Sequence, residues 1–137
     1  MNHKIEVDWN SGMSFETVLN GHKLVMDATP EVGGNDLGPR PKILLLASLA
    51  GCSGMDVVSM LKKMRVELDG FKMELEGVLT EEHPKIYNKI TIVYKFKGEN
   101  LPLEKIEKAV NLSQERYCGV SAMLREAAEI DYRIEIL

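Results

Sequence analysis

The feature that most constrains this chain is one long apolar stretch, residues 43–61. A single charge, Asp56, interrupts it, although serines and two glycines are scattered among its leucines, valines and methionines. The stretch is marginally long for a membrane span and too polar for one. A segment that is apolar nearly all round is typical of a helix in the middle of a protein. We therefore expect a central helix over residues 41–64 and no membrane association.

Small residues within this helix indicate a close contact with another backbone. They recur every three or four positions, at Ala47, Ala50, Gly51 and Gly54. Glycine inside a helix costs roughly 1 kcal/mol relative to alanine, so two of them beside Cys52 indicate a site or a tight helix crossing. Since a helix so apolar on all sides needs cover beyond one sheet, we predict a homodimer.

Alternating patterns on either side of the helix predict strands. Residues 4–9 alternate apolar and charged side chains, and Asn20-Gly21 is a strong hairpin signal between residues 15–19 and 23–28. These features predict an antiparallel meander of three strands. Beyond the helix, the same alternation predicts two long antiparallel strands and a closing strand, in residues 71–76, 89–96 and 132–136.

Two further helices are expected before the closing strand. Pro102 opens one, Cys118-Gly119 interrupts it, and residues 120–127 form a short third helix. The resulting order, β-β-β-α-β-β-α-α-β, is an α+β architecture. We find no repeat or linker, and interpret residues 1–137 as a single domain.

Composition argues against several classes of function. Seventeen basic residues against 21 acidic ones give a net charge of −4, without the cationic cluster that nucleic-acid binding requires. The first residues lack the apolar core of a signal peptide, and two cysteines without a secretion signal indicate a reducing, cytoplasmic environment.

No resident metal or cofactor is expected. The three histidines, His3, His22 and His83, are scattered singly, which does not suit a zinc site. Gly33-Gly34 precedes a helix but lacks the lysine and hydroxyl residue of a phosphate loop. The glycine- and proline-rich loop around it, residues 29–40, fits a functional loop or a plain crossover equally well.

The residues that could carry chemistry are Cys52 and Cys118. Cys52 lies in the most apolar helix, where burial makes a thiol inert. Cys118 lies at a helix junction, where free N–H groups of the following helix favour a thiolate, and Arg116 and Arg125 are near it in sequence. The residues alone leave two interpretations open, a redox pair and two inert core thiols.

Two motifs resemble a known family. Residues 38–58, GPRPKILLLASLAGCSGMDVV, closely resemble the central helix of the OsmC/Ohr superfamily (osmotically inducible and organic hydroperoxide resistance proteins). Residues 117–121, YCGVS, resemble that family's second cysteine motif, and the pairing of the two looks like the YhfA-like branch. The expected order of elements is similar along essentially the whole chain.

The resemblance implies a fold, an assembly and a reaction. It implies an interlaced homodimer in which antiparallel sheets wrap around paired central helices. It also implies a thiol-dependent peroxidase, part of an antioxidant response to oxidative stress, in which Cys52 attacks an organic hydroperoxide and becomes a sulfenic acid. Cys118 then condenses with it to a disulfide, and a dithiol reductant restores both thiols.

The sequence departs from the family pattern in two ways. Active members carry an arginine in the N-terminal strands and a glutamate ahead of the first cysteine, whereas the first arginine here is Arg40 and Lys42-Ile43 occupies the glutamate position. We therefore expect Cys52 to react more slowly than in an arginine-bearing relative, with Arg40, Lys42 or Arg116 as candidate cations. The alternatives are a non-catalytic member that binds a small apolar ligand at the dimer interface, and a structural dimer with inert thiols.

Overall fold

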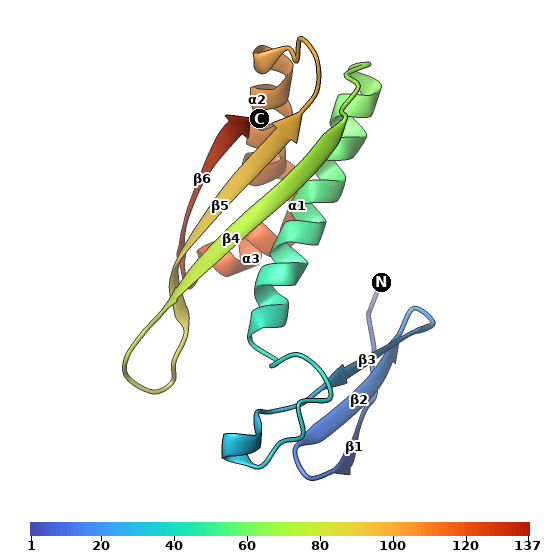
Figure 1. The fold of residues 1–137 in the computed structure, drawn as a ribbon, viewed down its shortest axis with the longest axis vertical. Coiled ribbons are helices and arrows are strands. Elements are labelled where there is room, and N and C mark those ends of the chain that lie inside the picture. The colour runs from blue at the N-terminus through green and yellow to red at the C-terminus, as the bar shows by residue number, and fades with distance from the viewer. The chain divides into compact units, whose positions relative to one another are not determined.

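The long apolar stretch forms one helix, α1 (Ile43–Lys63), in a computed structural model that describes all residues from 1 to 137 (Figure 1). Its bounds agree closely with the expected ones. The helix does not begin at Pro41, which instead closes a turn by accepting a hydrogen bond from the N–H of Leu44 (3.1 Å). The chain divides into two compact units, Met1–Leu45 and Leu46–Leu137. The single domain 1–137 stays a prediction.

The second unit is built on a sheet of three strands in the order β4 (Gly70–Leu79), β5 (Tyr87–Lys97) and β6 (Glu129–Ile136). β5 is central, and its alternate side chains are fully buried, namely Ile90, Ile92, Tyr94 and Phe96. Phe71 of β4 stacks on Phe96 with ring centroids 4.6 Å apart. This period-two burial confirms the strand pattern read from the sequence.

One stripe of α1 is fully buried in this unit. It comprises Leu49, Ser53, Val57 and Leu61, four residues apart and therefore on one face of the helix. By length and composition alone, α1 would pass as a membrane span. Leu49, Val57 and Leu61 of the stripe share one buried cluster with the strands of the sheet, so α1 packs on the sheet along this face, whereas only 17% of its most apolar window is buried in the single chain.

The closing strand differs from expectation in its direction. β4 and β5 are antiparallel as predicted, but β6 runs parallel to β5, with Ile90 opposite Ile130. A parallel neighbour requires a long crossover. Here α2 (Leu103–Leu112), a π-helical turn (Ser113–Tyr117) and α3 (Gly119–Arg125) provide it. The second sheet is therefore mixed.

The first unit is the predicted three-stranded antiparallel meander, ordered β1 (Val7–Ser11), β2 (Ser14–Leu19) and β3 (His22–Met26). Asn20 and Gly21 both have positive φ, 52° and 84°, which confirms the hairpin. The expected half-burial of the first strand is wrong for the single chain, because all five residues of β1 are exposed, Trp9 by 64%.

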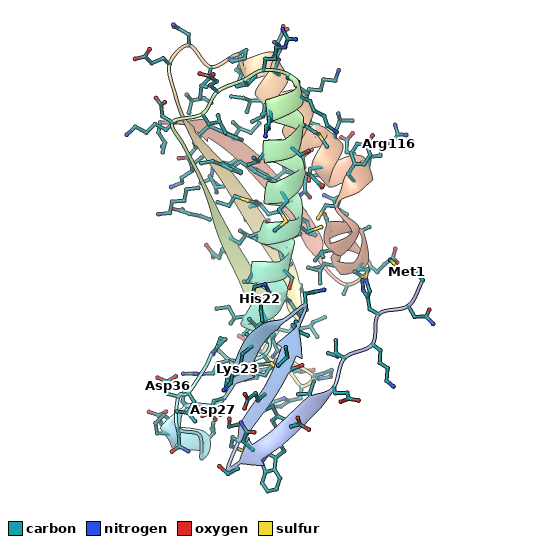
Figure 2. All side chains as sticks on the ribbon, turned by 90° about the vertical axis from the view of Figure 1, so that its right-hand side faces the viewer. Met1, His22, Lys23, Asp27, Asp36 and Arg116 are labelled. Carbon is teal, nitrogen blue, oxygen red and sulfur yellow. The ribbon has the colours of Figure 1, made fainter.

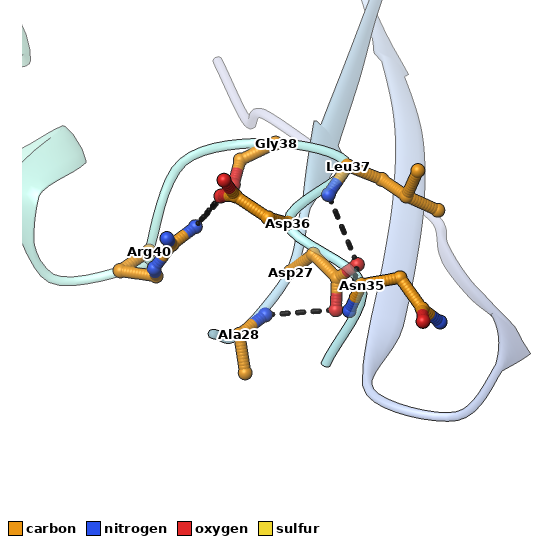
Figure 3. Close-up of polar contacts among 7 residues, drawn as sticks. All are labelled: Asp27, Ala28, Asn35, Asp36, Leu37, Gly38 and Arg40. Carbon is orange, nitrogen blue, oxygen red and sulfur yellow. Dashed lines mark hydrogen bonds and ion pairs between the residues drawn. The ribbon is translucent and has the colours of Figure 1, made fainter. Parts of the chain in front are cut away.

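Buried Asp27 organises the loop between β3 and α1 (Figures 2 and 3). Its Oδ1 accepts the N–H of Ala28 (2.7 Å), and its Oδ2 accepts those of Asn35 and Leu37 (both 3.1 Å). These backbone hydrogen bonds, the one from Ala28 foremost, lower the pKa of Asp27. One carboxylate thus accepts hydrogen bonds from three amides of the loop. The loop also contains a short 3-10 helix, Pro30–Val32.

The Asp27 carboxylate gives a testable prediction. In Asp27→Asn only one side-chain oxygen can accept, so either the Ala28 amide or the Asn35 and Leu37 amides will lose protection from hydrogen exchange. Because the pKa of Asp27 is lower in the folded state than in the unfolded state, the ionised carboxylate stabilises the folded state above the ordinary carboxyl range. This stabilisation is lost as the pH falls through the folded-state pKa. Asp8→Asn, on the exposed β1 strand, is the matched control. Equal protection in both variants would contradict this role.

Candidate functional site

The structure brings the two cysteine thiols together. Cys52 lies in the middle of α1 and is half-buried, whereas Cys118 is 3% exposed and lies at the junction before α3. Both are free thiols, and their side chains are in hydrogen-bonding contact. Cys118 belongs to the buried core cluster, and Cys52 packs against that cluster while part of its surface stays accessible in the single chain.

The surroundings of Cys118 favour its neutral form, contrary to the sequence-based expectation of a thiolate. Its sulfur caps α3 by accepting the N–H of Ser121 (3.3 Å), and this bond alone would favour the anion. Burial outweighs the bond and raises the pKa of Cys118 to about 11, with the contact to Cys52 adding to the rise. Cys118 is therefore a neutral thiol near pH 7.

A π-helical turn delivers Cys118 to this position. After α2, residues Ser113–Tyr117 form this turn, in which Ser113 and Gln114 are buried. The chain then becomes extended at Cys118, whose N–H is held by the carbonyl of Ser113 (2.8 Å). Such turns are frequent at functional sites.

A buried polar cluster that the sequence analysis missed lies beside the thiols. Ser53, the residue after Cys52, contacts Tyr94 Oη and Ser113 Oγ through its own hydroxyl (2.5 and 2.8 Å). Ser113 Oγ also donates to Asp56 Oδ2 (3.0 Å), and Gln114 completes the cluster. The only sequence signal was the four-residue spacing that puts a serine, Ser53, among the apolar residues of the buried stripe.

The candidate cations belong to different units of the chain. Arg116, in the second unit, is exposed (Figure 2) and lies over the ring of Tyr117, 5.4 Å from its centroid. Arg40 is paired with Asp36 (2.7 Å) inside the first unit, to which Lys42 also belongs. Arg125 instead reaches the buried cluster, donating to Gln114 Oε1 (2.9 Å).

Two further features bound the chemistry. No three side chains of the metal-binding types His, Cys, Asp and Glu lie together. An apolar groove of about 530 Å³ runs along the outer face of α1, and Gly51, Met55 and Phe71 are among its lining residues. Since Gly51 precedes Cys52, the groove adjoins the helix turn that carries the half-buried thiol.

Comparison with known proteins identifies the family. The profile of the OsmC-like protein family matches residues 33–133. This chain belongs to the OsmC-like family. Protein YhfA of Escherichia coli K12 is 32% identical over 132 residues, which is 96% of each chain. A hypothetical protein from Aquifex aeolicus is 32% identical, with a TM-score of 0.84 over 100% of this chain and 98% of that one.

A more distant structure supports the OsmC/Ohr fold alone. The organic hydroperoxide resistance protein OhrB of Bacillus subtilis is 19% identical, with a TM-score of 0.66 over 97% of this chain and 98% of that one. The α+β fold expected from the sequence is thereby confirmed.

The environment of Cys118 gives a second prediction. In Cys52→Ser, where Cys118 is the single cysteine, its burial remains, so alkylation by iodoacetamide should rise about tenfold per pH unit, without levelling off, between about pH 8 and about pH 10. The same variant in denaturant should level off in the ordinary thiol range and serves as the control. A plateau at the same pH in both states would contradict the raised pKa of Cys118.

Proposed function

We propose that this OsmC-like protein reduces organic hydroperoxides through the Cys52/Cys118 pair, as a cytoplasmic thiol-dependent peroxidase. The observation that carries the proposal is the contact between two free thiols of unequal exposure. Relatives of the same fold are named for organic hydroperoxide resistance. The half-buried thiol suits attack on a substrate, and the buried thiol suits a reaction with its neighbour.

The proposed reaction has three balanced steps. The Cys52 thiolate attacks the distal peroxide oxygen, the O–O bond breaks, and the alkoxide leaves as an alcohol after taking up a proton. The Cys118 thiol then attacks the sulfur of the Cys52 sulfenic acid and gives up its proton, so that the S–S bond forms and the sulfenic hydroxyl group leaves with that proton as water. A dithiol reductant returns two electrons and two protons, and is itself oxidised to a disulfide.

The two cysteines have different roles in this reaction, which gives the third prediction. Cys52→Ser should abolish consumption of cumene hydroperoxide, because the attacking sulfur is gone. Cys118→Ser should consume one equivalent and stop as a sulfenic acid that dimedone labels. In the parent, mass spectrometry should find a peptide pair joined through Cys52 and Cys118. Two variants that both consume peroxide like the parent would contradict the proposal.

A second candidate function rests on the apolar groove along α1. A non-catalytic protein could hold a small apolar ligand against Met55, Val58 and Phe71, since the groove is almost wholly apolar. This function requires no redox change at the thiols. If the cysteine variants leave peroxide consumption unchanged, this binding function is the one to test.

The active form in our proposal is a homodimer. α1 leaves Met55 76% exposed and Val58 47% exposed, and the first unit leaves Trp9 and Phe15 exposed as well. Apolar side chains gathered on such faces mark contact surfaces in soluble proteins. A second copy of the chain would cover them, in keeping with the close helix crossing that the small residues of α1 allow.

Gly51 gives the fourth prediction, which tests this crossing. Within one chain a Cβ at Gly51 meets nothing within 4 Å, so Gly51→Ala should stabilise an isolated helix by about 0.5–1 kcal/mol. At a close crossing the same methyl group would separate the two helices. We therefore expect sedimentation equilibrium to show a weaker dimer for Gly51→Ala.

The matched control is Gly119→Ala, at the start of α3, where a Cβ is also free of contacts. It should leave the dimer unchanged. Equally tight dimers in both variants would contradict a crossing at Gly51. A parent that sediments as a 15.4 kDa monomer at micromolar concentration would contradict the dimer itself.

A further inference from the structure

Gln114, the single glutamine of the chain, lies at the centre of the buried polar cluster. Its Oε1 accepts hydrogen bonds from Ser121 Oγ (2.8 Å) and Arg125 Nη2 (2.9 Å). Because a guanidinium group has only donors, the oxygen must face Arg125 and the amide nitrogen must face the other way. The orientation of the amide is therefore determined by its partners.

The amide nitrogen of Gln114 faces the hydroxyl groups. Nε2 donates to Tyr94 Oη (2.7 Å) and to Ser53 Oγ (3.2 Å). At the far end Ser113 Oγ donates to the carboxylate of Asp56, so Ser113 must accept from Ser53. Ser53 must in turn accept from Tyr94.

The hydrogen bonds thus run in one direction from Arg125, through the Gln114 amide and three hydroxyl groups, to the carboxylate of Asp56. Each of these three hydroxyl groups donates one hydrogen bond and accepts at least one. A fully satisfied buried network is rigid, because each bond polarises the next and each group lost leaves another unpaired.

The two polar atoms of the Gln114 side chain each bond a residue that is next to a cysteine in the sequence or hydrogen-bonded to one. On one side Ser53 directly follows Cys52 along α1. On the other side Ser121, whose hydroxyl is held by Oε1, donates its backbone N–H to Cys118 Sγ (3.3 Å). The amide is therefore a bridge between the segment that carries one thiol and the helix turn that holds the other.

We propose that Gln114 is a positioning residue for the Cys52/Cys118 pair, and that it sets how readily the two sulfurs form and keep a disulfide. A disulfide tolerates only a narrow range of separations and dihedral angles. A residue that fixes α1 relative to the start of α3 raises the effective concentration of one thiol beside the other. The proposal uses the thiol–disulfide pair of the proposed function but not its peroxide substrate.

The test measures the dithiol–disulfide equilibrium of the full-length protein in dithiothreitol redox buffers near pH 7. Gln114→Leu keeps the size of the side chain and removes both ends of the bridge. We expect its equilibrium to move toward the dithiol by about tenfold, or about 30 mV for a two-electron couple. Gln114→Glu keeps acceptors for Ser121 and Arg125 but has no donor for Tyr94, and should shift the equilibrium less.

Two tyrosines provide a matched pair of variants. Tyr94→Phe removes a hydroxyl that accepts from Gln114, and should shift the equilibrium in the same direction. Tyr132→Phe removes a hydroxyl on the neighbouring strand that bonds exposed Asn111 (2.9 Å), and should leave the equilibrium unchanged. Thermal unfolding of each reduced variant separates loss of stability, which any buried network would cause, from the shift in redox equilibrium.

Several outcomes would overturn the proposal. One is a folded Gln114→Leu variant whose equilibrium equals that of the parent. If that variant does not fold, Tyr94→Phe and Ser121→Ala decide, and an unchanged equilibrium in both refutes positioning. A parent that forms no disulfide refutes it outright. A shifted equilibrium in a protein that consumes no hydroperoxide would support Gln114 while contradicting the proposed peroxidase.

Discussion

Burial of Ser53 at the interface between α1 and β5 is the constraint on which the site depends. A hydroxyl group removed from solvent costs free energy unless it is hydrogen-bonded, and Ser53 has no exposed surface. Tyr94 and Ser113 supply the bonds. Each of them is buried in turn, so each needs a further partner, and the requirement passes along the cluster until it ends at the charges of Asp56 and Arg125.

The polar cluster continues the buried face of α2. The adjacent residues Ala109 and Val110 of α2 are both buried, and one turn later Ser113 and Gln114 are buried in the same way. The π-helical turn that contains these two polar residues brings the chain to Cys118 in an extended conformation, from which α3 starts with the sulfur as its cap. The buried thiol thus directly follows the turn that supplies two members of the polar cluster.

Much of the fold could be predicted, because its signals are local. Alternation predicted the strands, Asn20-Gly21 predicted the hairpin, and the apolar stretch predicted α1 almost to its ends. The parallel pairing of β6 could not be predicted, since the alternation of a strand does not record the direction of its neighbour. The family resemblance pointed to both cysteines, and the structure places their thiols in contact.

The polar cluster escaped prediction for a different reason. Serine and glutamine are mostly surface residues, and Tyr94 reads as one more residue on the apolar face of a strand, so only their convergence in space, from positions 53, 94 and 114, makes them a site. The protonation of Cys118 escaped as well, since the sequence suggested the helix N-terminus but not the degree of burial that outweighs it. For the polar cluster and for the protonation of Cys118 alike, the decisive quantity was burial away from water.

The unequal burial of the two thiols has a consequence for the missing family arginine. A cation would lower the free energy of whichever thiolate it faced, but Cys118 is buried and holds its proton near pH 7. Because Cys118 keeps its proton in the resting protein, an arginine of the family type would act on Cys52 and not on Cys118. In the proposed reaction Cys118 gives up its proton only as its sulfur attacks the oxidised Cys52, so burial assigns that proton transfer to the second step.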